Sequence, residues 1–171
     1  MDRTDLITTH MRSTFFAEWL TLWWEKRDGE GYLRLPFGEG RRAPLAAVDQ
    51  SRAIAAMLLD PEPHNLRSYA LYGAVEQDHH DIARELSATL GLPVHYEPIS
   101  VEEFRAGLRE RRFAEHTVQH LCSVAVDYRN GVFAGTNVEK ITGRRPLTVE
   151  QFAARNRSGF EFSGPYFIPA S

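Results

Sequence analysis

The stretch that decides the fold is LITTHMRSTFFAEWLTLWW, residues 6–24, close to the start of the chain. Its first part, residues 6–11, is apolar and β-branched on both faces, which is typical of a strand covered on two sides in a parallel sheet. From Phe15 onward the aromatic and leucine side chains recur at helical intervals. The sequence therefore predicts a buried strand that runs directly into a helix rich in aromatic residues.

A parallel strand needs neighbours and a preceding crossover, but only five residues come before this one. We therefore expect the chain to begin in the middle of a sheet. A parallel pair is predicted over residues 6–15 and 68–73, beside a small second sheet.

The composition is that of one globular domain covering residues 1–171. Hydrophobic residues make up 43 %, charged residues make up 25 % and the formal net charge is −3, without a basic stripe that would favour nucleic acid. One cysteine, Cys122, excludes an internal disulfide framework and indicates a reducing compartment. No apolar run approaches the roughly 20 residues of a membrane helix, and no signal peptide is visible. We therefore expect a cytoplasmic protein with no membrane or nucleic-acid partner.

Capping residues and apolar spacing predict the elements that follow. Asp49 and Asp78 are predicted N-caps, and capping boxes begin at Ser100 and Thr148. The expected helices cover residues 50–59, 78–90, 101–112, 114–130 and 148–157, and the expected strands cover residues 32–37, 68–73 and 93–99. Pro36 predicts that the first of these strands lies at a sheet edge.

The motif GEGRRA, residues 38–43, satisfies the G-x-G-x-x-A pattern of dinucleotide loops. In such a loop the last position opens a helix whose N-terminus holds the pyrophosphate. Here Pro44 follows at once and the extended run LAAV comes next. We therefore interpret the motif as a hairpin turn and expect no cofactor-binding residue in it.

His116 and His120 lie four residues apart on a predicted helix, which places both imidazoles on one face. A metal site needs a third ligand that the sequence does not identify, so we expect no metal and keep the two histidines as candidate acid/base residues. His79, His80 and Asp81 are interpreted as a solvated helix start. Cys122 is interpreted as an inert core residue.

The aromatic residues of the opening stretch exceed what one amphipathic helix face can bury. They are Phe15, Phe16, Trp19, Trp23 and Trp24. Some of them must therefore face a ligand, a partner or a second copy of the chain.

Four segments, in order, resemble the NmrA-like proteins, the atypical short-chain dehydrogenase/reductases. They are MRSTFFAEWL (11–20), LRLPFGEGRRAPLAAVDQSRAIAAMLLDP (33–61), SYALYGAVEQDHHDIARELSATLGLPVHYEPISVEEFRAGL (68–108) and TGRRPLTVEQFAARN (142–156). The resemblance covers nearly the whole chain. In the family these segments form only the second half, and the first half would hold the glycine-rich nucleotide loop and any catalytic Tyr or Lys.

The resemblance implies an α/β fold, an α+β remnant of a Rossmann-type NmrA-like fold that lacks the N-terminal nucleotide-binding strands. It places Arg12 beside the nicotinamide and assigns Phe15, Phe16 and Trp19 to the wall of the substrate cleft. Ser13 stands where the family has proline. The family uses NAD(P), but the resemblance leaves the isolated chain without cofactor residues, so no cofactor is expected on it.

Three functions follow as hypotheses. The first is a truncated NmrA-like protein that acts as a small-molecule-binding or accessory subunit without redox activity of its own. The second is half of a split NAD(P)-dependent oxidoreductase, completed by a partner chain. The third is a cofactor-independent isomerase or cyclase that uses the aromatic cleft with His116 or His120. Because a strand without its neighbours exposes an edge, we expect a homodimer through the stretch from Leu6 to Trp24, or a heteromeric Rossmann-type partner.

Overall fold

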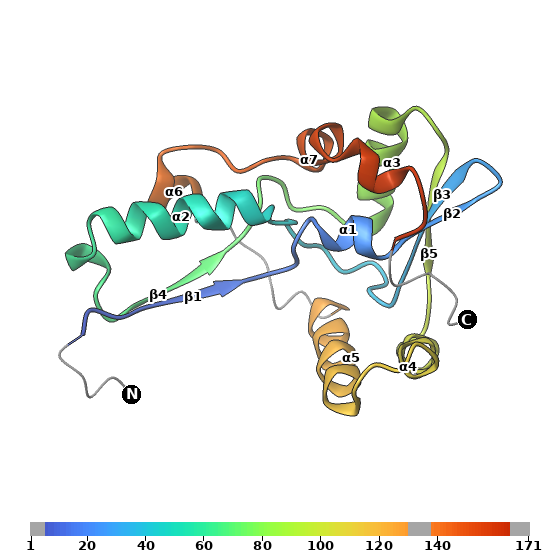
Figure 1. Cartoon of the computed structure of the whole chain (residues 1–171), viewed down its shortest axis with the longest axis horizontal. Helices are drawn as coiled ribbons and strands as arrows, with labels where there is room; N and C mark the ends of the chain where they lie inside the picture. The colour runs from blue at the N-terminus through green and yellow to red at the C-terminus, as the bar shows by residue number, and fades with distance from the viewer. Residues whose placement is uncertain (1–5, 130–137, 165–171) are drawn as a thin grey trace.

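The structure is a computed structural model that describes residues 6–129 and 138–164. Two small sheets organise these residues (Figure 1). The first pairs β1 (Thr9–Ser13) with β4 (Arg67–Leu71), and the second has the order β2 (Trp24–Arg27), β3 (Glu30–Leu35), β5 (Val94–Pro98). The helices are α1 (Trp19–Leu22), α2 (Ala47–Leu59), α3 (His79–Leu90), α4 (Val101–Glu110), α5 (Glu115–Arg129), α6 (Val138–Thr142) and α7 (Val149–Arg155). Short 3₁₀ turns cover Glu62–His64 and Arg157–Phe160.

The predicted parallel pair is confirmed, with β1 and β4 in register from Thr9 opposite Arg67 to Ser13 opposite Leu71. The prediction that β1 is covered on both faces is wrong. Its burial alternates, with His10 and Arg12 exposed, because helix α2 lies along one face of the pair (Figure 1). The β1–β4 pair and α2 share a small apolar core of their own.

The long aromatic helix predicted from Phe15 to Trp24 is wrong as well. Helix α1 is a single turn, and Trp24 already begins strand β2. The reason is tertiary: the Trp24 indole Nε1 donates to the Phe160 carbonyl at 3.1 Å, and its ring lies edge-on to that of Phe160. Strand β2 returns through a turn at Asp28 and Gly29, whose φ angles of 50° and 85° suit an Asp-Gly hairpin.

Strand β3 is central in its sheet, so the edge position predicted from Pro36 is wrong. It pairs antiparallel with β2 and parallel with β5. Pro36 lies one residue beyond the end of β3, where its missing N–H removes no ladder bond.

The predicted helix caps are confirmed at Asp78, Ser100 and Thr148, each of which accepts from the backbone N–H three residues later. The cap predicted at Asp49 is wrong, because α2 already begins at Ala47. Asp49 is instead buried in the first turn of α2, where it accepts from the Leu147 N–H at 2.7 Å. It thereby ties α2 to the segment before α7.

The main core joins the second sheet to the helices around it. Leu33, Leu35, Ile82, Leu86 and Leu108 are fully buried there, together with Trp24. In Figure 1, α3 and α7 lie on one side of this region and α4 and α5 on the other. None of the helices within residues 6–129 and 138–164 is long and apolar enough to cross a membrane.

Candidate functional site: an aromatic cavity

A cavity of about 330 Å³ lies beyond the end of β1, between α1, α4 and α5. Aromatic and aliphatic side chains form most of its wall. The lining residues are Ser13, Thr14, Phe15, Phe16, Trp19, Phe37, Phe104, His120, Leu121, Val124 and Tyr128. None of them is acidic, so the cavity suits an apolar ligand with few polar groups.

The chain just after β1 is held rigidly, which fixes the aromatic wall. The Leu45 N–H donates to the Phe15 carbonyl at 2.9 Å, and the Ala17 N–H donates to the Leu45 carbonyl at 2.9 Å. Phe15 is thereby buried while Phe16 and Trp19 stay partly exposed toward the cavity. A pre-formed wall of this kind reduces the ordering cost of binding.

The three residues assigned to the wall of the substrate cleft, Phe15, Phe16 and Trp19, all line the cavity. Arg12, the substrate-side residue placed beside the nicotinamide, is exposed on β1 and is not among the lining residues. Both candidate histidines are exposed, but only His120 is among the lining residues, which it joins from α5.

Sequence reasoning missed several lining residues, above all the aromatic pair Phe37 and Tyr128. The aromatic pair stands far from the opening stretch in sequence, so only tertiary contacts reveal its place. Ser13, which the sequence singles out because it stands where the family motif has proline, lies in the cavity wall. Its hydroxyl is buried and has no hydrogen-bond partner among the described residues.

Directly behind the cavity lies a buried histidine, His79, which is 0 % exposed. The interpretation of residues 79–81 as a solvated surface is therefore wrong for His79. Its ring packs against Phe15, Phe37 and Tyr96, with centroid distances of 5.8, 5.1 and 5.0 Å. Burial, and then the nearby Arg42, hold the pKa of His79 well below its usual value, so the ring is neutral at pH 7.

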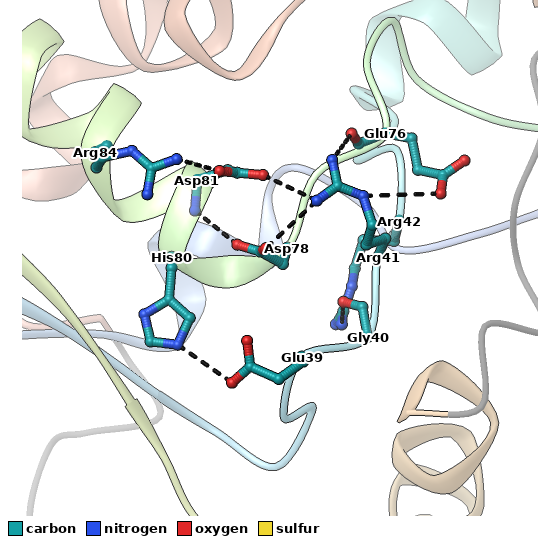
Figure 2. A network of polar contacts seen from close by, with 9 residues as sticks. All are labelled: Glu39, Gly40, Arg41, Arg42, Glu76, Asp78, His80, Asp81 and Arg84. Atoms are coloured by element: carbon teal, nitrogen blue, oxygen red, sulfur yellow. Dashed lines mark hydrogen bonds and ion pairs between the residues drawn. The ribbon is translucent and has the colours of Figure 1, made fainter.

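A buried arginine, Arg42, lies beside this histidine and is also 0 % exposed. Its neighbour Arg41 points the other way, to Glu76, Asp78 and Asp81 at the start of α3 (Figure 2). The Arg42 side chain instead donates one hydrogen bond, from Nη2 to the Gly40 carbonyl, and its Nε and Nη1 have no hydrogen-bond partner among the described residues. Burial lowers the pKa of Arg42 to about 10, which still leaves the guanidinium charged at pH 7.

The GEGRRA motif does not fit a dinucleotide. The Gly40 N–H donates to the Phe37 carbonyl at 3.1 Å, which confirms a turn, although its flanks do not pair as a hairpin. The chain then runs extended, and the next helix, α2, begins only at Ala47. A Cβ on Gly40 would meet the Tyr128 carbonyl oxygen at 2.2 Å, so this glycine allows close packing on α5 rather than a phosphate contact. We therefore derive no cofactor chemistry from this loop.

Metal and thiol chemistry find little support in the part of the chain that the structure describes. It contains no group of three or more His, Cys, Asp or Glu side chains placed to hold a metal ion. Cys122 is 3 % exposed within the apolar core, which confirms its interpretation as a core residue.

Comparisons with known sequences and structures show several proteins that are similar to this chain. It is 28 % identical over 156 residues to an NAD(P)H azoreductase of Xenophilus azovorans, covering 89 % of this chain and 54 % of that protein. It matches an NADPH-dependent quinone oxidoreductase of Escherichia coli, solved with NADPH, with a TM-score of 0.72 and 20 % identity over 88 % of this chain and 54 % of that one. It matches NmrA, a negative transcriptional regulator solved with NAD, with a TM-score of 0.69 and 14 % identity over 90 % and 53 %. No family model matches the chain.

These matches confirm the α/β fold of NAD(P)-binding reductases and epimerases. Within that class the structural neighbours are the NmrA-like proteins, so the resemblance drawn from the sequence is confirmed at the level of fold. The chain spans about half the length of the curated relatives it matches.

Proposed function

We propose that the chain binds a planar, mainly apolar small molecule in the aromatic cavity, as the substrate-side portion of an NmrA-like protein without redox activity of its own. The observation that carries the proposal is the wall of the cavity, where Phe15, Phe16, Trp19, Phe37 and Tyr128 converge. A volume of about 330 Å³ falls in the usual range of ligand pockets and suits a ligand of two or three fused rings.

The names of two similar proteins support a conjugated ligand. One is an azoreductase and the other a quinone oxidoreductase, so each is named for a conjugated compound. Flat rings of that kind gain from stacked and edge-to-face contacts with aromatic walls.

A second candidate function is one half of an oxidoreductase that a separate nucleotide-binding chain completes. The observation that favours it is strand β1, which has a paired neighbour on one side only within the described residues. The cavity lies beyond the carboxyl end of β1, and ligands of open α/β sheets bind at the carboxyl ends of strands. The cofactor-independent isomerase or cyclase retains only His120 as a cavity-lining acid/base candidate.

Titration with N-phenyl-1-naphthylamine, a neutral fluorescent ligand of two linked ring systems, tests the first proposal. We expect saturable binding at micromolar concentrations. The variant Val124→Trp fills the cavity from α5 and should abolish binding, whereas Val126→Trp, on the same helix but 45 % exposed and outside the lining, should not. Absence of binding to the wild type, or equal binding to both variants, would contradict the proposal.

Calorimetry with NADPH separates the two candidates. The chain alone should show no dissociation constant in the low micromolar range, because its glycine motif offers no helix N-terminus to a pyrophosphate. Tight NADPH binding to the isolated chain would contradict the absence of redox function. Tight binding that arises only after a nucleotide-binding chain is added would favour the second candidate.

A further inference from the structure

Three of the rings that line the cavity, Phe15, Phe37 and Tyr128, lie between the cavity and the buried guanidinium of Arg42. We call these three rings the aromatic floor. The guanidinium carbon of Arg42 lies 4.4 Å from the ring centroid of Phe37, 4.9 Å from that of Tyr128 and 6.0 Å from that of Phe15. All three rings also line the cavity. Arg42 is therefore separated from a bound ligand by one layer of aromatic rings.

No carboxylate in contact neutralises this charge among the described residues. Asp78 is the carboxylate that raises the pKa of Arg42, but its oxygens are committed to the Arg41 guanidinium at 3.4 Å and the Asp81 N–H at 2.8 Å. His79, in the same buried cluster, is neutral at pH 7. The cavity wall itself contains no acidic side chain. The interior of the cavity therefore carries a positive potential that water screens poorly.

The rings transmit this potential instead of blocking it. A cation on one side of an aromatic ring draws electron density toward itself, so the opposite face and the edges become more positive. Phe15, Phe37 and Tyr128 are mutually perpendicular, with interplanar angles of 81° to 85°, so edges as well as faces are presented around the cavity.

We propose that the cavity selects anionic planar ligands, such as aryl carboxylates or sulfonates, over neutral ligands of the same shape, and that Arg42 sets this preference from behind the aromatic floor. The proposal rests on the proposed function, since it assigns the charge of the ligand that the cavity binds. An unpaired buried guanidinium is costly for the fold, and such groups concentrate at functional sites.

A matched pair of competitors tests the proposal. Bound N-phenyl-1-naphthylamine is displaced from the wild type by 2-naphthalenesulfonate or by 2-naphthalenesulfonamide, which share one shape and differ in charge at pH 7. We expect the sulfonate to bind about tenfold more tightly, the size of a single Coulomb contact across part of a protein interior. Arg42→Met should bring the ratio close to one, and Arg41→Met, which removes a neighbouring but exposed cation, should leave the ratio unchanged.

Failure of this inference differs from failure of the proposed function. If the reporter binds but the two competitors are equal on the wild type, the charge preference is overturned while the aromatic cavity stands. A preference that survives in Arg42→Met overturns the role of Arg42. If the reporter does not bind at all, both proposals fall. Should Arg42→Met not fold, Arg42→Gln takes its place, and the wild-type ratio decides by itself whether the preference exists.

Discussion

The guanidinium of Arg42 is fully buried without a carboxylate partner among the described residues, although a charged group is normally hydrated or paired. Even a buried ion pair can often be replaced by apolar residues of similar volume with no loss of stability or with a gain of about 1–4 kcal/mol, and the Arg42 guanidinium has no carboxylate partner in the described part of the chain to offset its desolvation. We therefore expect Arg42→Met to raise the free energy of unfolding, measured by urea denaturation. Arg41→Met should lower it by no more than about 1 kcal/mol, since the Arg41 ion pairs are exposed. A strongly destabilised Arg42→Met protein would show that the guanidinium has partners that stabilise the fold.

His79 gives the protein a predictable response to acid. Its pKa is lowered in the folded state, so below pH of about 6.5 the unfolded chain takes up a proton that the folded chain refuses. The free energy of unfolding should therefore fall with decreasing pH, by up to about 1.4 kcal/mol per pH unit for this one group. The groups that influence His79 are Arg42 and His80, both of which disfavour its charged form.

Urea midpoints at pH 7.5 and 5.5 measure this effect. His79→Phe, whose ring suits the same aromatic surroundings, should lose part of the acid sensitivity. His116→Gln replaces an exposed histidine and should keep the wild-type pH dependence. Identical pH dependence in wild type and His79→Phe would show that other groups cause the acid effect.

Among the secondary-structure elements, those with local signals were predicted well and those set by distant contacts were not. Asp78 and Thr148 cap their helices as expected because the cap and the N–H it serves lie three residues apart. Trp24 looks helical by spacing, but its place in β2 depends on Phe160, 136 residues further along. The site follows the same division. Phe15, Phe16 and Trp19 were found through a motif, whereas Arg42 and His79 look like ordinary surface residues until the fold buries them.

The β2–β3 hairpin depends on a glycine under an indole ring. A Cβ at Gly31 would meet the Trp24 ring at 1.8 Å, and Trp24 is 0 % exposed and cannot move aside. We expect Gly31→Ala to destabilise the protein by about 1–3 kcal/mol, as overpacking does. Gly107→Ala is the control, since on helix α4 its Cβ would meet only the flexible end of Arg111. Thermal unfolding followed by circular dichroism compares the two, and equal melting temperatures would contradict the steric argument.

At the scale of the whole molecule, one edge of β1 has no strand partner among the described residues, and from this edge we predict association. In a parallel ladder, alternate residues bond to alternate sides. The Thr14 N–H bonds to the Leu71 carbonyl and the Thr8 carbonyl accepts from Leu66, so even-numbered residues of β1 face β4. The N–H of Met11 therefore points to the other edge, where the described residues supply no strand. Such an edge is a template for pairing with another chain.

We therefore expect the chain to be at least dimeric at micromolar concentration, as measured by light scattering. Met11→Pro removes an edge donor without removing a bond to β4 and should shift the protein toward the monomer. Leu59→Lys is the control, because it removes an 88 % exposed apolar side chain at the end of helix α2 rather than a donor on β1, and it should leave the mass unchanged. A monodisperse wild-type monomer would contradict an association through β1.

Because the three tryptophans differ in burial, the intrinsic fluorescence of the protein can be used to follow the cavity. Trp23 and Trp24 are 2 % and 0 % exposed, whereas Trp19 is partly exposed and lines the cavity. The long-wavelength part of the tryptophan fluorescence, and its quenching by dissolved ions, should therefore come from Trp19 alone. If the cavity is electropositive, iodide should quench that emission more efficiently than caesium, and a bound ligand should protect it from both. One fluorophore already present in the chain can thus follow occupancy and local charge without any label.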